Sequence, residues 1–200
     1  VQAAFGYSRI DQLGHVDDEH QVPNTLDWDL WLGPVPHRKY NPVYHPGRWR
    51  GWRQFGGGNM GDFVCHIVDP VFWALNLGAP AMVVAEAEGY DPRAHAETFP
   101  ASSKIRFEFA ARGKRPPVSL VWYDGDRYRP PHPEELKPGE ESIPIPGWRP
   151  GKQVGALVVG DKGKIVYGSH GAKDWRIIPD EKMKAYMGDR KRQQEPNVAG

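Results

Sequence analysis

The chain contains a single cysteine, Cys65, in 200 residues, which excludes a framework of intramolecular disulfides and leaves the compartment undecided. No apolar run approaches the roughly 20 residues that a membrane-spanning helix needs. The 26 basic and 25 acidic side chains nearly cancel. We therefore expect neither a membrane span nor a nucleic-acid partner.

The common nucleotide-binding and hydrolase motifs are also missing. The sequence has no P-loop, no G-x-S-x-G, no H-E-x-x-H and no paired C-x-x-C. Three consecutive glycines occupy residues 56–58, but they follow an aromatic, proline-rich stretch rather than a strand, so they do not form a dinucleotide-binding fingerprint. We expect that this chain alone binds neither NAD nor NADP.

Period-2 patterns and β-branched residues dominate the second half of the chain, whereas one long helical pattern precedes them. This order predicts an α+β fold with an open, mainly antiparallel sheet. Helices would cover one face of the sheet and leave the other available for oligomerisation. We expect a domain over residues 1–179 and a short helix with a solvated tail over 180–200. The predicted strands span residues 1–10, 81–89, 103–111, 118–125 and a hairpin at 154–169, and the predicted helices span 25–34 and 60–77.

The 60–77 helix carries one narrow polar stripe, because Asp62, His66, Asp69 and Trp73 recur at i, i+4, i+7 and i+11. The remaining surface is apolar, which predicts a largely buried helix in which Asp62 pairs with His66. Such a pair would act as a general base with its orienting acid. It could equally satisfy two polar groups without any catalytic role. A zinc site at Asp62, Cys65 and His66 is less favoured, since adjacent residues point in different directions on a helix.

The triple glycine in front of this helix favours a functional interpretation. Glycine adds no packing and costs conformational entropy, so it is expected where backbone approaches a ligand closely or needs a positive φ. Aromatic and basic residues gather just before it. They could form a sugar-binding cleft together with Asp69, or the tryptophans could simply cover the helix. The candidate substrate-binding residues are Tyr44, His45, Arg48, Trp49, Trp52, Arg53 and Asp69.

Two runs of residues carry a family resemblance: DWDLWLGP at 27–34 and GDFVCHIVDP at 61–70. With their surroundings, they resemble the C-terminal domain of the Gfo/Idh/MocA (glucose–fructose oxidoreductase / inositol dehydrogenase) family, over about residues 1–178. The resemblance is to a bacterial branch, which would place the protein in a bacterial cytoplasm or periplasm. In this family a Rossmann domain binds NAD or NADP, and the second domain supplies the substrate cleft and often the oligomer interface.

The resemblance implies roles for two residues. His66 would take a proton from a sugar hydroxyl as hydride leaves for the nicotinamide, and Asp62 would orient it. The lysine that the family carries on its Rossmann domain has no counterpart here, so we expect the second domain without its first, with a Rossmann domain acting in cis or in trans. The implied function is the substrate-binding and catalytic half of a sugar or cyclitol oxidoreductase. The alternatives are a non-catalytic oligomerising or carbohydrate-binding module, or part of a redox-assisted glycosidase or lyase.

Overall fold

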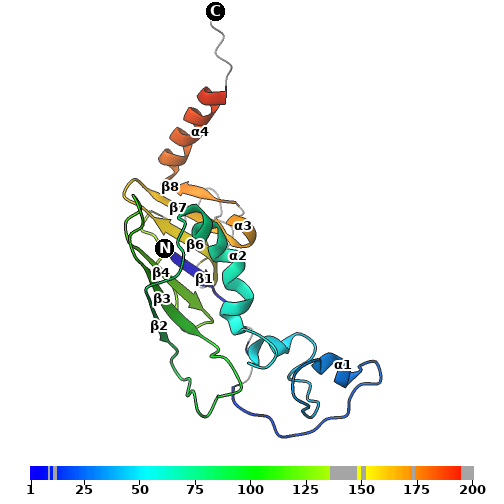
Figure 1. Ribbon diagram of the computed structural model, residues 1–200. Coiled ribbons are helices and arrows are strands. Elements are labelled where there is room, and N and C mark those ends of the chain that lie inside the picture. The colour runs from blue at the N-terminus through cyan, green and yellow to red at the C-terminus, as the bar shows by residue number, and fades with distance from the viewer. Residues whose placement is uncertain (9, 11–12, 136–147, 150–151, 173, 195–200) are drawn as a thin grey trace, which may run out of the picture.

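A computed structural model of the chain describes residues 1–8, 10, 13–135, 148–149, 152–172 and 174–194. It shows an open, mostly antiparallel sheet with a long helix across one face, which confirms the expected α+β class (Figure 1). The sheet order is β2-β3-β4-β1-β6-β7-β8, with the short β5 paired to β6. The strands are β1 Gln2–Phe5, β2 Met82–Glu86, β3 Ser103–Phe109, β4 Val118–Asp124, β5 Trp148–Arg149, β6 Lys152–Val159, β7 Lys164–Gly168 and β8 Arg176–Ile178.

The first strand lies at the centre of the sheet, where it pairs parallel with β4 and antiparallel with β6. The other described pairs are antiparallel. The predicted 154–169 hairpin is confirmed as β6 and β7, whose connecting turn is closed by a hydrogen bond from the Gly160 amide to the Gly163 carbonyl. The hairpin turn thus sets the pairing of β6 with β7, whereas β1 pairs on both sides with strands that lie more than 100 residues further along the chain.

Both predicted helices form, although each has different bounds from those expected. Asp27 caps α1 (Trp28–Leu32) by accepting a hydrogen bond from the Leu30 amide, and Gly33 ends it with a positive φ. The long helix α2 spans Gly58–Ala74 and continues through Pro70. A 3₁₀ turn, η1 (Arg48–Gly51), precedes α2. The short element α3 (Ser169–Ala172), which contains non-helical dihedral angles, follows β7, and α4 (Asp180–Gln194) follows β8. None of the described helices combines the length and apolar character that a bilayer crossing requires.

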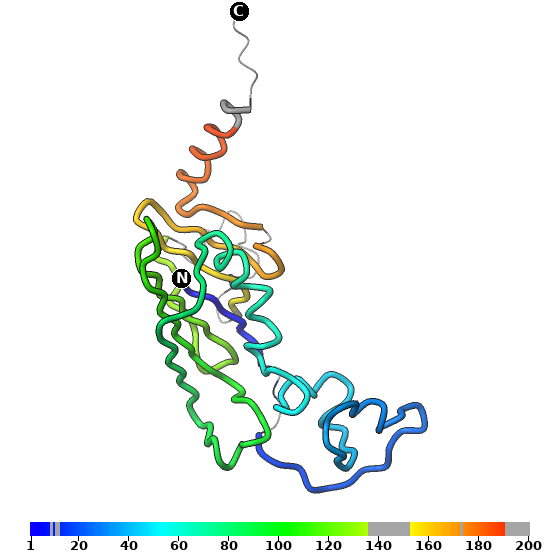
Figure 2. The backbone as a smooth tube through the Cα atoms, viewed as in Figure 1, coloured from blue at the N-terminus to red at the C-terminus, as the bar shows by residue number. Residues whose placement is uncertain are grey.

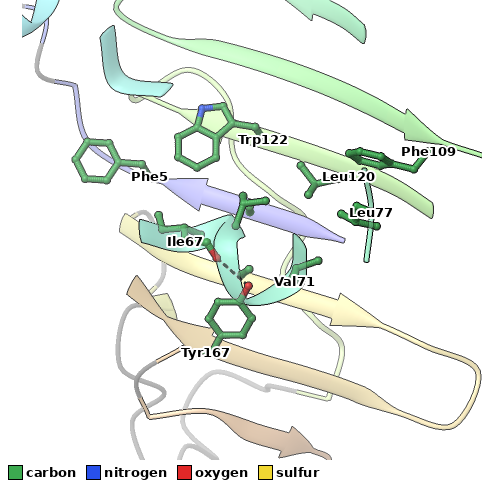
Figure 3. Packing of buried hydrophobic residues seen from close by; sticks show 11 residues of the cluster. Phe5, Ile67, Val71, Leu77, Phe109, Leu120, Trp122 and Tyr167 are labelled. Atoms are coloured by element: carbon green, nitrogen blue, oxygen red, sulfur yellow. Dashed lines mark hydrogen bonds between the residues drawn. The ribbon is translucent and has the colours of Figure 1, made fainter. Parts of the chain in front are cut away.

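The main core forms where one face of α2 meets the sheet. Ile67 and Val71 of α2 pack against side chains from β1, β4, β6 and β7, with Trp122 fully buried among them (Figure 3). The Tyr167 hydroxyl donates a 2.8 Å hydrogen bond to the Ile67 carbonyl, which joins the helix to β7. This contact fixes α2 over the centre of the sheet.

One expectation about surfaces is wrong, and a second is refined. The helix α2 is not largely buried, because a single helix covers only part of a seven-strand face, and Trp73 is 89% exposed. The outer face of the sheet is not uniformly free either. Leu157, Val166 and Ile178 form a small buried cluster there, within the chain itself. The exposed apolar side chains of the sheet lie instead mainly on the edge strand β2, all five residues of which are exposed.

Residues 16–55, which carry α1 and η1, extend away from the sheet and are called the arm (Figure 2). They hold a second core, which is aromatic. Its centre is Tyr44, whose ring packs edge-on against Trp52 and lies 4.5 Å from the Arg38 guanidinium. Arg38 also forms a 2.8 Å ion pair with Glu97, in the loop between β2 and β3. The arm is therefore a separately packed unit that Glu97 ties to the sheet. Its buried residues are Trp28, Leu32, Tyr40, Tyr44 and Trp52.

Candidate active site on the exposed face of α2

The polar stripe of α2 faces outward. His66 and Asp69 are exposed, and Asp62 is half-buried. The Asp62 carboxylate accepts a 2.9 Å hydrogen bond from the Nε of Arg50, and no hydrogen bond joins it to His66 within the described chain. The expected Asp62–His66 pair is therefore not formed, because a basic residue from η1 reaches the carboxylate instead.

Arg50 is held from several sides. Its guanidinium lies 4.5 Å above the Trp49 ring and donates to the Gly47 carbonyl. It therefore holds the start of α2 against the aromatic arm and keeps the Asp62 carboxylate in place. Sequence reasoning singled out Arg48 and Arg53 but missed Arg50. No local pattern distinguishes the three, since only the packed 3₁₀ turn decides which one meets Asp62.

The glycines before α2 make this close packing possible. A Cβ at Gly56 would lie 2.7 Å from the Arg50 carbonyl oxygen. Gly58 has a φ of +67°, and a Cβ there would lie 2.7 Å from the Phe99 ring. Both expected reasons for glycine thus apply, but the close neighbour is the protein's own chain rather than a ligand.

His66 has aromatic neighbours on two sides. Phe63 lies edge-on to it at 5.9 Å between ring centroids, and the His170 ring stacks on it at 4.4 Å with an interplanar angle of 21°. His170 belongs to α3, more than 100 positions away in the sequence. The only sequence signal for it was an isolated histidine beside glycines after a hairpin.

The seven candidate substrate-binding residues divide into two groups. Tyr44 and Trp52 are 1% and 3% exposed in the aromatic core, so their ring faces are taken up by packing. Arg53 is exposed but bonds to the Thr98 carbonyl and the Tyr90 hydroxyl. The other four candidates keep accessible side chains. They are His45, Arg48, Trp49 and Asp69, of which Arg48 and Trp49 directly precede Arg50 in the sequence.

Two cavities follow the flank of α2 that faces β2 and β3. An apolar groove of about 300 Å³ is lined by Val64, Cys65 and Phe72 on the helix and by Phe107 on β3. A second cavity of about 330 Å³ lies at the start of the helix, and Asp124 is one of the residues that line it. Apart from Asp69, the residues that line the groove are apolar or weakly polar, so they suit packing rather than sugar hydroxyls.

The Asp124 carboxylate anchors the start of α2 from below. Its Oδ1 accepts hydrogen bonds from the Asn59 side chain and the Ser103 amide, and its Oδ2 accepts from the Ser103 hydroxyl and the Trp122 indole. Burial raises the pKa of Asp124 above its usual range, although these donors act in the opposite direction. Through Asn59, this network connects α2 to strands β3 and β4.

The site does not provide a metal or dinucleotide centre. Within the described residues no three histidine, cysteine or acidic side chains converge on a metal position. Cys65 lines the apolar groove, whereas His66 stacks on His170. The cavity at the start of α2 is lined by two acidic residues, Glu86 and Asp124, and by no basic side chain, so it does not suit a pyrophosphate. These residues do not fit NAD or NADP.

Comparison with known proteins agrees with the fold. A search of the curated proteins found no match. A family profile described as "Oxidoreductase family, C-terminal alpha/beta domain" matches residues 7–114, more than half of the chain, including α2 and the aromatic arm. The chain therefore belongs to the Gfo/Idh/MocA oxidoreductase family, as a C-terminal domain.

Proposed function

We propose that this domain is the substrate-binding and proton-transferring half of a nicotinamide-dependent sugar or cyclitol oxidoreductase. The observation that carries the proposal is the open placement of His66, with Asp62 one helical turn before it, in a domain of this oxidoreductase family. A catalytic pair on an outward-facing helix is accessible both to a substrate and to a separate cofactor-binding domain. Because this chain does not fit the nicotinamide cofactor, hydride transfer belongs to that other domain, in cis or in trans.

The chemistry of this chain is then proton transfer and hydroxyl binding. The neutral His66 imidazole accepts the proton of the substrate hydroxyl that is being oxidised. Asp62 uses one oxygen to hold Arg50, and a carboxylate has further lone pairs that can accept a hydrogen bond from a neighbouring hydroxyl. Asp62 would thereby orient the substrate and would not orient the His66 ring.

The accessible candidates would surround the polyol. Trp49 lies beside Arg50, and Arg48 and His45 offer polar groups for hydroxyls. Asp69 also lines the apolar groove, so it would reach the ligand only from that edge of the site. Tyr44, Trp52 and Arg53 would support this wall from within the arm rather than touch the ligand. We infer a sugar-sized ligand between the arm and the polar stripe of α2, and not in the apolar groove on the other flank.

The test is an enzyme in which this domain is joined to a dinucleotide-binding domain of the same family, assayed against a panel of sugars and cyclitols. His66→Asn should lower turnover about 10²–10⁴-fold. Its melting temperature should stay near that of the parent, because His66 is exposed. The control is His20→Asn, which changes an exposed histidine of the arm that bonds Asp18, and it should leave turnover intact. Full activity in His66→Asn would refute the assignment.

A homo-oligomer is the second part of the proposal, and exposed apolar surface supports it. Met82, Val83 and Val84 of the edge strand β2 are 39–52% exposed, and an unpaired apolar edge favours association. Face-to-face packing would use the half of the sheet formed by β2 and β3. In the other half, Leu157 of β6 and Val166 of β7 are already buried within the chain. Light scattering should show a dimer or larger species at micromolar concentration, and a monomer there would contradict it.

A further inference from the structure

Two imidazoles from distant parts of the chain meet at the proposed site. The His66 and His170 rings are nearly parallel, with centroids 4.4 Å apart, and both side chains belong to exposed residues. Two exposed rings bury little surface against each other. Their contact is therefore not accounted for by packing of the core.

The backbone around His170 adopts an unusual conformation to place that ring. His170, Gly171 and Ala172 have successive φ angles of 60°, 83° and 59°, all in the left-handed region. Residues other than glycine rarely occupy this region, and they persist there only where surrounding structure holds them. Such strain gathers at functional sites, so this turn is a candidate for a functional role.

The strained turn is fixed to the same part of α2 that carries His66. Tyr167, at the end of β7, is 3% exposed and donates its hydroxyl proton to the carbonyl of Ile67, the residue after His66. Burial, and then the nearby Asp69 carboxylate, raise the pKa of Tyr167 far above its usual range, so the hydroxyl remains a donor. This hydrogen bond therefore joins α2 to the end of β7, one residue from His66 and three residues from His170.

An exposed imidazole on a helix would otherwise sample several orientations, because its χ2 torsion has a broad energy profile. A stacked partner restricts the plane of the ring and so the direction of its nitrogen lone pair. Proton transfer depends strongly on that direction, and small misplacements of a catalytic group cost up to about a hundredfold in rate.

We propose that His170 is a positioning residue, whose ring stacks on His66 and holds its imidazole in the plane needed to accept the substrate proton. This inference rests on the proposed role of His66. It requires a flat ring at position 170 rather than a titratable group. A phenylalanine there should therefore replace histidine, whereas asparagine, which tolerates left-handed backbone, should not.

The first experiment uses the 200-residue chain and carbon–proton NMR spectra of the His66 ring. His170→Asn should shift the His66 ring-proton signals downfield, because the ring current of the neighbour is lost, and His170→Phe should keep them shielded. Ala172→Gly relaxes another left-handed residue of the turn without touching a ring, so it is the matched control and should leave the His66 signals in place. Unchanged His66 signals in His170→Asn would overturn the stack.

The second experiment measures turnover in the enzyme joined to its dinucleotide-binding domain. His170→Asn should lower kcat about ten- to a hundredfold with KM within about twofold, and His170→Phe should restore most of the loss. Full kcat in His170→Asn, or no rescue by His170→Phe, would overturn the positioning role. If His66→Asn were itself fully active, the proposed function would fail with it, while the NMR result would still report on the stack.

Discussion

The buried Asp124 carboxylate allows a sharp test of how α2 is anchored. It is 2% exposed and accepts four hydrogen bonds, two at each oxygen. Asp124→Asn conserves the volume but replaces one acceptor oxygen with a donating amide. Whichever way the amide turns, its NH₂ group faces two donors. These are either the Asn59 side chain and the Ser103 amide, or the Ser103 hydroxyl and the Trp122 indole.

Each buried donor left without an acceptor costs about 1–3 kcal/mol. Two such losses, partly offset because a charge no longer has to be buried, lower the free energy of unfolding by about 2–4 kcal/mol. For a chain of this size that corresponds to a fall in melting temperature of roughly 5–15 °C. The control is Asp126→Asn, which changes an exposed acid that accepts a hydrogen bond from the Ser102 hydroxyl. It should shift the melting temperature by no more than about 2 °C.

The pH dependence gives a second readout. Burial raises the pKa of Asp124 in the folded protein above its unfolded value of about 3.9. The carboxyl therefore contributes most to stability below the unfolded pKa, and part of that contribution is lost as the pH rises through the folded pKa. Denaturant titrations from pH 4 to 8 should show the stability gap between parent and Asp124→Asn narrowing as the pH increases. Equal stability at all these values, with a melting temperature within 1 °C of the parent, would refute the anchoring role.

Three further predictions concern the sheet, the arm and the cofactor. Gly155→Ala should destabilise the fold by more than about 3 kcal/mol or prevent folding, because a Cβ there collides with the Tyr167 carbonyl oxygen. The control Gly160→Ala, in the hairpin turn, should fold normally, and circular dichroism of both variants checks the difference. Burial acts to raise the pKa of Glu97, but hydrogen bonds from Arg38 and His15 hold it below its usual value. Glu97→Gln should therefore cost about 0.5–1.5 kcal/mol at pH 7, and this difference should disappear as the pH falls through the lowered pKa, which urea titrations at several pH values would check. Calorimetry of the chain alone should detect no micromolar binding of NAD(H) or NADP(H), and such binding would contradict the assignment of cofactor binding to another domain.

Local sequence rules were sufficient for most of the secondary structure. Period-2 patterns placed β2, β3, β4 and the β6–β7 hairpin, and the predicted 25–34 helix contains α1. The i, i+4 spacing placed Asp62 and His66 on one stripe of α2, and the family motif around them agrees with the profile match. These features depend on neighbours within a few residues, where backbone geometry alone determines which side chains share a face.

Only the tertiary structure decided which groups meet. Asp62 bonds Arg50 rather than His66, because the 3₁₀ turn of the arm brings the Arg50 guanidinium to the carboxylate. Tyr44 and Trp52 enter a separate core, and His170 reaches His66 from more than 100 residues away. Burial likewise depends on how much of a sheet one helix can cover. Long-range contacts such as these arise from the packing of whole elements, which no local spacing in the chain encodes.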